Sequence, residues 1–373
     1  MPHTTKAIIN LAAIRHNLSI VKQLAPHSKV MAVIKADAYG HGLIEIAQTL
    51  ADAEGLAVAR LEEALLLRGE NIEQRILLLG GFIDMASLQQ CAEHSIDIVI
   101  HSWNSVETLL TATLEKPVNV WLKHNSGMHR LGLSIEEFRQ ADPLLGSCAN
   151  VAEKIFMTHF SASDETDSTS TDQQLAAFQQ ATEGLEAPLS LANSAAIIKH
   201  QHTHADWVRP GIMLFGANPI GANSQPQFPV DLLPAMTLSA HVMAIRTIEK
   251  GASVGYNGCW IADRESKIAT VGIGYGDGYP RHASNGTPVL VNGQRATLAG
   301  TVSMDLITID ITDCQSVNIS DEVILWGEGL KAETIATYAD TISYELFTSI
   351  SKRVPRLYLN PGPNRTIPKA IEI

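Results

Sequence analysis

Eight short apolar runs alternate with amphipathic stretches between residues 30 and about 215, and this alternation constrains the fold most. The runs lie at 30–34, 56–59, 76–79, 96–100, 118–122, 155–158, 189–192 and 207–208. Helical spacing separates them, for example at 43–50, 61–68, 85–94 and 172–182. Eight strand-helix repeats with fully apolar strands are typical of a closed parallel barrel. We therefore predict an α/β fold whose N-terminal part is a (β/α)8 TIM-type barrel, preceded by a helix at 11–24 that Asn10 caps.

The residue composition of the sequence changes after Gly216, which predicts a second domain. Residues 218–226 are rich in turn-forming residues, and β-type runs follow at 235–248, 267–273, 288–291, 306–311 and 322–326. Glycine and asparagine punctuate these runs, as in antiparallel sheets. We place the barrel at 1–220 and a mostly antiparallel β domain at 221–373, with which the first few residues could pair.

The composition argues against several classes of partner. The net charge is −12 and no run of Lys or Arg stands out, whereas nucleic acids and anionic membranes attract concentrated basic patches. No apolar stretch approaches the roughly 18 residues that span a bilayer, and the N-terminus lacks a signal-peptide pattern. The four cysteines have no CxxC spacing, which suits a reducing compartment. We expect a cytoplasmic enzyme that binds neither nucleic acid nor membranes.

Polar or ionisable residues follow most of the eight apolar runs. They are Lys35, Arg60, His101, Lys123, His159, Asn193 with Ser194, and Arg209. In a parallel barrel the active site lies at the carboxyl ends of the strands. Lys35 could extend its amine to water, or burial could lower its pKa and make it a nucleophile. The convergence of so many polar strand ends favours the second interpretation.

The loops after the seventh and eighth runs suit a phosphate group. At 193–196 and 209–212 they offer a serine hydroxyl, a glycine and helix-start amides. Ordinary turn and cap chemistry would use the same residues. Combined with a strand-end lysine, they suggest a phosphorylated aldehyde bound as a Schiff base, namely pyridoxal phosphate (PLP).

Six segments resemble the alanine racemase family of fold-type III PLP enzymes, and the resemblance covers nearly the whole chain. They lie at 33–42, 126–132, 158–160, 192–195, 209–212 and 300–305. The resemblance implies that Lys35 binds the PLP aldehyde and that Arg209 faces the pyridine nitrogen. Around the phosphate it places Tyr39, Ser194, Gly211, Ile212 and Tyr344.

The resemblance also implies a two-base interconversion of L- and D-alanine. Lys35 would be one base, and Tyr256 from the partner subunit of a head-to-tail homodimer would be the other. To act as a base near neutral pH, a tyrosine must lose its phenolic proton, which requires neighbouring charges or hydrogen bonds that favour the phenolate. In the family, the equivalent of His159 bonds this tyrosine and connects to Arg209, and such a cationic network favours the phenolate.

Further positions match substrate-binding residues of the family. Arg130, together with Met304 and Asp305 of the partner subunit, would bind the substrate carboxylate region. Lys123 matches a lysine that is often carbamylated in relatives, and either a carbamate or a chloride would offset the charge of Arg130. Ser190 stands where some relatives have a histidine bonded to the ring-nitrogen arginine, a change that could loosen Arg209 and alter the basicity of the ring without changing the reaction.

Several alternatives remain open from the sequence. A racemase of serine or of broader specificity fits the same motifs, as does a PLP decarboxylase, although decarboxylases usually place a carboxylate where Arg209 stands. A lone-barrel PLP carrier would not need the β domain. D-Alanine could be made for peptidoglycan or catabolised. The alternating His200, His202 and His204 resemble a metal tract, but only Asp206 accompanies them, and we predict no metal site.

Overall fold

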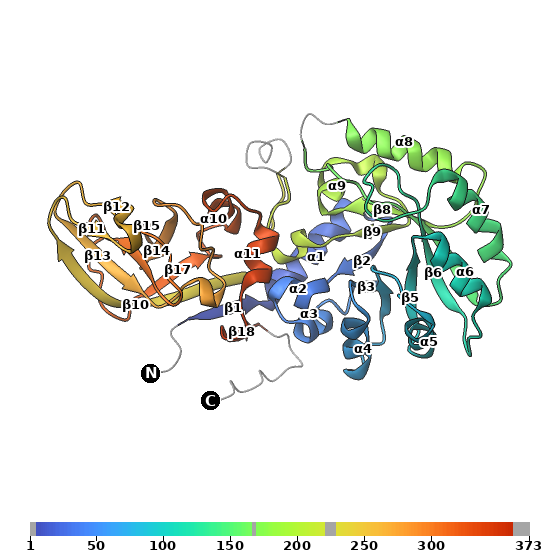
Figure 1. Cartoon of the computed structure of the whole chain (residues 1–373), viewed down its shortest axis with the longest axis horizontal. Helices are drawn as coiled ribbons and strands as arrows, with labels where there is room; N and C mark the ends of the chain where they lie inside the picture. The colour runs from blue at the N-terminus through green and yellow to red at the C-terminus, as the bar shows by residue number, and fades with distance from the viewer. Residues whose placement is uncertain (1–4, 166–168, 221–228, 361–373) are drawn as a thin grey trace.

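The computed structural model describes residues 5–165, 169–220 and 229–360. It has two parts along its long axis, an α/β barrel and a β domain (Figure 1). No helix among the described residues combines the length and the apolar character that crossing a membrane requires. The first part contains the apolar strands that the sequence pattern predicts.

Eight parallel strands form a closed barrel, in which each strand pairs with the next and the last pairs with the first. They are β2 (Lys29–Val33), β3 (Gly55–Val58), β4 (Arg75–Leu78), β5 (Ile96–Ile100), β6 (Val118–Lys123), β7 (Val151–Met157), β8 (Leu189–Asn193) and β9 (Trp207–Arg209). The helices after them include α3 (Leu43–Thr49), α4 (Leu61–Gly69), α5 (Met85–Glu93), α6 (Trp103–Thr111), α7 (Ile135–Gly146), α8 (Ser170–Thr182) and α9 (Ser194–Lys199). The predicted barrel is therefore confirmed, with strand ends shifted by a few residues.

The helix before the barrel begins where the sequence predicts. Helix α1 spans Leu11–Leu24, and Asn10 Oδ1 accepts hydrogen bonds from the amides of Ala12 and Ala13 at 3.1 and 3.3 Å. An asparagine at this position satisfies amides that have no partner within the helix. The cap fixes the point where the chain leaves the β domain and enters the barrel.

The second part is built on one eight-stranded sheet in the order β13-β16-β15-β14-β17-β10-β1-β18. Its strands are β1 (Lys6–Asn10), β10 (Met236–Ile248), β13 (Ser266–Val271), β14 (Pro288–Val291), β15 (Gln294–Leu298), β16 (Ile307–Asp310), β17 (Glu322–Trp326) and β18 (Arg356–Leu359). All pairings are antiparallel except that of β1 with β18. The division at 220/221 adjoins residues outside the described part of the chain, and the ranges 1–220 and 221–373 remain our proposal.

Smaller elements of the second part did not stand out in the sequence. A two-stranded ribbon, β11 (Ser253–Val254) with β12 (Trp260–Ile261), lies at its outer end, and helices α10 (Ala332–Tyr338) and α11 (Ser343–Ser349) lie between the large sheet and the barrel (Figure 1). These elements are too short to show a clear periodic pattern of apolar residues. Helix α11 carries Tyr344 to the barrel mouth.

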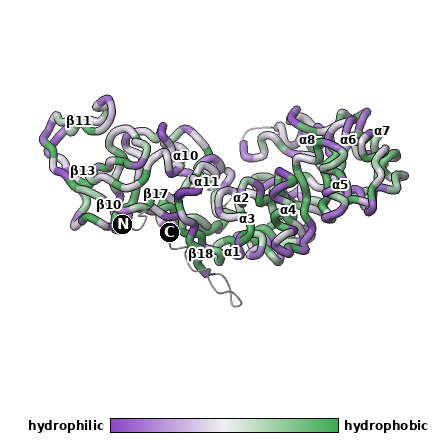
Figure 2. The backbone as a smooth tube through the Cα atoms, turned by 60° about the horizontal axis from the view of Figure 1, so that its bottom comes forward, coloured by the Kyte–Doolittle hydropathy of each residue, from purple (hydrophilic) through white to green (hydrophobic). Residues whose placement is uncertain are grey.

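One hydrophobic core runs through both parts of the molecule. It includes Trp121 and Phe156 of the barrel and Trp326 of the large sheet, all fully buried. Figure 2 shows hydrophobic residues concentrated inside both parts, and hydrophilic ones in the outer turns. A shared core fixes the β domain against the barrel within one chain.

Candidate active site

The backbone directly after Lys35 is left-handed. Lys35 opens α2 (Lys35–Gly40) at the end of β2, and the four residues after it have φ of 51 to 55°. They are Ala36, Asp37, Ala38 and Tyr39. Residues other than glycine lose about 1–2 kcal/mol each in this conformation. Such strain persists only where surrounding contacts impose it, and it tends to occur at functional sites.

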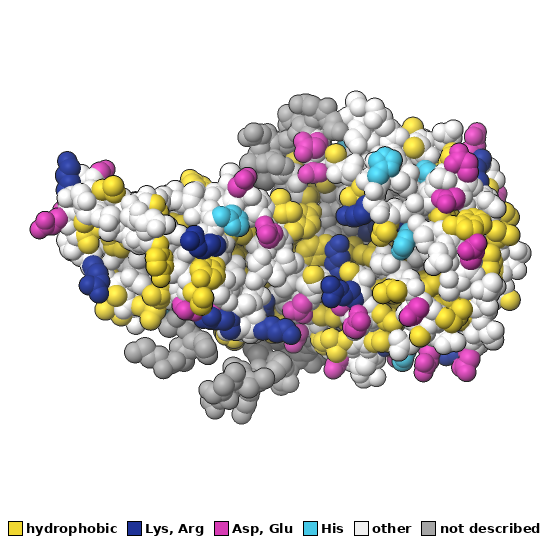
Figure 3. All heavy atoms as spheres, in the orientation of Figure 1, with side chains coloured by type: hydrophobic (Ala, Val, Ile, Leu, Met, Phe, Trp, Pro, Cys, Tyr) yellow, Lys and Arg dark blue, Asp and Glu magenta, His cyan; other side chains and the backbone are white. Residues whose placement is uncertain are grey.

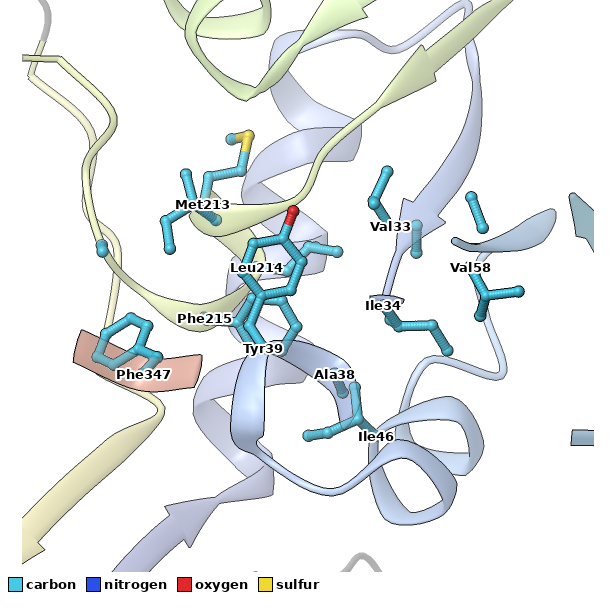
Figure 4. Packing of buried hydrophobic residues seen from close by; sticks show 14 of the residues in the cluster. Val33, Ile34, Ala38, Tyr39, Ile46, Val58, Met213, Leu214, Phe215 and Phe347 are labelled. Atoms are coloured by element: carbon cyan, nitrogen blue, oxygen red, sulfur yellow. The ribbon is translucent and has the colours of Figure 1, made fainter. Parts of the chain in front are cut away.

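Hydrogen bonds and packing hold this strained segment. Glu63 Oε1 accepts from the Ala36 amide at 2.7 Å, and the buried ring of His41 contacts the Tyr39 carbonyl through Nδ1 at 2.9 Å. The Tyr39 ring packs against Phe215, with centroids 4.8 Å apart (Figure 4). Sequence reasoning missed Glu63, which bonds back to the N-cap amide as in one half of a capping box, because the N-cap residue is Arg60 and lacks the side-chain acceptor of that pattern. The segment therefore orients Lys35 and Tyr39 together.

A cavity of about 1000 Å³ opens at the carboxyl ends of the barrel strands. Figure 3 shows a hollow between the two parts of the molecule, with hydrophobic side chains inside it and Lys and Arg side chains along its barrel side. Ten of the predicted site residues line the cavity: Lys35, Tyr39, Lys123, Arg130, His159, Ser194, Arg209, Gly211, Ile212 and Tyr344. Tertiary folding thus gathers residues that span more than 300 positions of the sequence.

The loops after β8 and β9 meet at one end of this cavity. Ser194 Oγ accepts a hydrogen bond from the Gly211 amide at 2.8 Å, and a Cβ atom on Gly211 would lie 2.4 Å from the Tyr39 hydroxyl. Burial raises the pKa of Tyr39 and also that of Tyr344, so both hydroxyls stay protonated. These hydroxyl donors, together with a glycine at 211 that lets the Tyr39 hydroxyl come close, fit the phosphate of PLP.

Arg209 is buried and held by neutral partners. Its Nη1 donates to Ser190 Oγ at 2.7 Å, and its Nη2 donates to the Thr158 carbonyl at 2.6 Å. Burial lowers the pKa of Arg209 to about 10, so the guanidinium stays charged at neutral pH. Ser190 therefore still contributes to the support of Arg209, because its hydroxyl accepts a hydrogen bond from the guanidinium.

His159 is a neutral member of the network. Burial lowers its pKa well below the ordinary value, and the charges of Arg209 and Lys123 lower it further. Its Nδ1 lies 3.4 Å from Arg209 Nη2. Since arginine can only donate, Nδ1 is the acceptor and Nε2 carries the ring proton. The positive charge of the expected cationic network therefore resides on Arg209, and His159 supplies a hydrogen-bond donor.

Two lysines share the cavity with Arg209 and Arg130. Burial and then the charge of Arg130 lower the pKa of Lys35, whereas Glu63 opposes the shift. Burial, followed by Arg209, Arg130 and Lys35, lowers the pKa of Lys123 to about 8. Four basic groups in one partly dry cavity favour anionic ligands such as phosphate and carboxylate.

Three predicted residues lie away from this cavity in the same chain. Tyr256 is 66% exposed in the short turn η4 (Tyr256–Gly258) between β11 and β12, at the outer end of the β domain (Figure 1). Met304 is 54% exposed, and Asp305 accepts a hydrogen bond from Arg353 Nη2 at 2.6 Å. None of the three lines the cavity. The single chain thus brings together the residues predicted around Lys35 and leaves the predicted second base, Tyr256, away from them.

The comparisons with known proteins cover both parts of the chain. The family model "Alanine racemase, N-terminal domain" matches residues 9–219, and "Alanine racemase, C-terminal domain" matches 235–358. An alanine racemase of Aeromonas hydrophila is 45% identical over 349 residues, which cover 93% of this chain and 97% of that protein. One from Vibrio cholerae is 44% identical, with coverage of 95% and 98%.

Solved structures agree with the sequence matches. The biosynthetic alanine racemase of Pseudomonas aeruginosa superposes with a TM-score of 0.92 at 43% identity, and the match covers 96% of this chain and 99% of that one. An alanine racemase of Bartonella henselae with covalently bound pyridoxal phosphate has a TM-score of 0.86 at 33% identity, with coverage of 96% and 100%.

Proposed function

This chain belongs to the alanine racemase family, and from that premise we propose how its residues share the reaction. The protein is a PLP-dependent racemase that interconverts L- and D-alanine. The observation that best supports the assignment of residues is the cavity that brings Lys35, Arg209 and Ser194 together. All three stand at or just after the carboxyl ends of barrel strands, where the strand-helix pattern predicted the active site.

The cavity residues divide into three groups around the cofactor. Lys35 would bind the PLP aldehyde, and Arg209 would donate to the ring nitrogen. The phosphate would lie among Tyr39, Ser194, Gly211, Ile212 and Tyr344. When bound, PLP withdraws electrons from the Cα atom of the amino acid and so weakens its bond to hydrogen. Because an arginine keeps its proton, Arg209 would donate to the ring nitrogen and not protonate it, which would moderate this withdrawal and limit side reactions.

Lys35 would move a proton on one face of the substrate. A base must be neutral to accept a proton, and burial together with Arg130 lowers the pKa of Lys35 in that direction. Glu63 accepts a hydrogen bond from the amide of Ala36, the next residue, and so fixes the position of the Lys35 backbone. The orientation and the lowered pKa of this amine both suit a general base.

Tyr256 of the partner subunit would move the proton on the opposite face. Its exposure in the single chain supports this proposal, because a tyrosine that works in a dry site must be covered by something. Other large apolar side chains of the β domain are exposed as well: Ile261, Tyr275, Met304 and Leu306. A head-to-tail homodimer would bury them against the barrel mouth of the other subunit. His159 would then donate its Nε2 proton towards the Tyr256 oxygen.

Arg130 and the backbone amide of Met304 of the partner subunit would orient the substrate carboxylate, with Asp305 of the partner subunit nearby. Lys123 would become carbamylated or lie beside a chloride, since some anion is needed among four basic groups. A carbamate forms from a neutral amine, and a pKa lowered to about 8 leaves part of Lys123 neutral near physiological pH. The resulting anion would offset the charge of Arg130.

One assay tests the reaction and its nearest alternative. PLP-loaded protein incubated with L-alanine in deuterated water should form D-alanine that carries deuterium at Cα. Carbon dioxide release would instead indicate a decarboxylase, and Arg209 at the ring nitrogen argues against that activity. Replacing alanine by serine in the same assay measures the breadth of specificity. We expect the enzyme in the cytoplasm, with D-alanine serving peptidoglycan synthesis or alanine catabolism.

A further inference from the structure

A cluster of metal-ligating side chains lies outside the active-site cavity, where α8 meets the end of α9. Asp172 in the first turn of α8, His200 after α9, and His202 in the turn η1 (Gln201–Thr203) offer ligand atoms within 4.8 Å of one another. His202 Nε2 is 3.2 Å from Asp172 Oδ1. In a tetrahedral zinc site with metal–ligand bonds near 2.1 Å, neighbouring ligand atoms are about 3.4 Å apart. Small side-chain rotations would therefore bring all three atoms to one ion.

One nitrogen of the His200 ring is left without a partner among the residues that the structure describes. Its Nε2 is buried and has no hydrogen-bond partner in the described part of the chain. A buried nitrogen without a partner calls for an explanation, and a bound cation would provide one.

The sequence tract suggested different ligands. His204 turns away, because its Nε2 contacts the Ile197 carbonyl at 2.9 Å. Asp206 accepts a hydrogen bond from the Leu189 amide at 2.7 Å. The acidic group of the cluster is instead Asp172, which lies 28 positions before His200 in the sequence. The expectation of no metal rested on Asp206 as the only acid near the tract, and the folded chain supplies another.

We propose that Asp172, His200 and His202 form a binding site for one divalent transition-metal ion, with water completing its coordination. Imidazole donors suit zinc, nickel and copper, whereas magnesium and calcium prefer oxygen ligands. Exposed Asp172 and His202 give an ion access from solvent, and half-buried His200 provides a fixed donor. The site does not overlap the residues assigned to PLP or alanine.

Metal binding is measured directly on the PLP-loaded enzyme without a histidine tag. After dialysis against a chelator and then against chelator-free buffer, the protein is equilibrated with Zn²⁺ and bound metal is determined by elemental analysis. We expect one Zn²⁺ per chain at saturation. Co²⁺ in its place should give the visible absorption of a low-coordinate nitrogen and oxygen site, and Mg²⁺ should not compete.

Matched variants decide whether these residues are the ligands. His202→Gln and Asp172→Asn should each weaken Zn²⁺ binding by about tenfold or more, as expected when a metal site loses an anchoring group. His204→Gln and Asp206→Asn, from the same stretch, should bind as the wild type does. His200→Gln should also weaken binding. Because His200 is half-buried, thermal unfolding without metal must show that this variant folds, and the two exposed positions decide the matter if it does not.

Two results would overturn the proposal. One is a wild-type protein that retains no stoichiometric Zn²⁺ after equilibration. The other is unchanged affinity in both His202→Gln and Asp172→Asn, which would place any bound ion elsewhere, for example on the cofactor.

Discussion

Glu63 Oε1 accepts a hydrogen bond from the Ala36 amide at 2.7 Å, and so ties helix α4 to the residue that follows Lys35. The other oxygen of the same carboxylate accepts from the amides of Ala59 and Arg60 at 2.9 and 3.1 Å. One side chain thus joins the ends of two neighbouring barrel strands at the cavity mouth. It also fixes Ala36, the first residue of the left-handed segment that orients Tyr39.

Replacing Glu63 should therefore lower the stability of the fold or change the pKa of Lys35, depending on the substitution. Glu63→Ala leaves three amides without this acceptor, and we expect a loss of about 1–3 kcal/mol in the free energy of unfolding, measured with urea. Glu63→Gln removes the charge that raises the pKa of Lys35. Since a base of lower pKa stays neutral in more acidic solution, the acidic limb of the kcat profile should move to lower pH. Glu62→Gln, on the exposed side of α4, is the control and should leave the profile in place.

Tyr256→Phe should nearly abolish racemisation in both directions, by about 10²–10⁴-fold, because a positioned acid-base group contributes that much. The absorbance of bound PLP should stay the same, since Tyr256 is not among the cofactor residues. In deuterated water the variant should still exchange the Cα hydrogen of one alanine enantiomer through Lys35. Exchange of both enantiomers at the wild-type rate would show that another group is the second base.

Mixing two inactive variants tests whether the sites are shared between subunits. Lys35→Ala and Tyr256→Phe homodimers should each be inactive, but a mixed dimer would contain one site with both bases. Random reassortment of equal amounts should then restore about a quarter of wild-type activity. If Tyr256 served its own chain, no mixture would regain turnover.

Ser190→Ala should weaken the support of Arg209. The variant removes a hydroxyl that accepts from a buried guanidinium at 2.7 Å, and hydrogen bonds to charged groups contribute about 1.5–3 kcal/mol. We expect the free energy of unfolding to fall by about that amount, with lower alanine turnover. Ser19→Ala removes an exposed hydroxyl on α1 and should change neither quantity.

The pH dependence of stability reports the chemical state of Lys123. An unmodified Lys123 has a pKa of about 8 in the folded protein, below its value in the unfolded chain. The unfolded chain then binds the proton more tightly. Relative to Lys123→Met, the wild type should gain stability as the pH rises from about 8 towards the ordinary lysine pKa, at up to about 1.4 kcal/mol per unit. A carbamylated Lys123, checked by intact mass with and without bicarbonate, should show no such gain.

The sequence by itself determined the barrel, because each strand is a short continuous run of apolar residues. Such a run is driven out of water regardless of which residues it packs against. It also determined the Asn10 cap, which depends on amides only two and three residues away. The motif residues around Lys35 and Arg209 were recognisable for the same reason, since each motif is short and continuous. Helix and strand ends differed by a few residues where side chains from elsewhere decide the last hydrogen bond.

Only the tertiary structure decided how these parts act together. The parallel pairing of β1 with β18 joins segments about 350 residues apart, and no local pattern encodes it. The left-handed backbone after Lys35 opposes the preference of every residue in it, so contacts from Glu63 and His41 must impose it. The charge state of His159 and the meeting of Asp172 with His200 likewise depend on burial and on distances through space. Such properties depend on contacts between residues that are far apart in the sequence, and these contacts exist only in the folded chain.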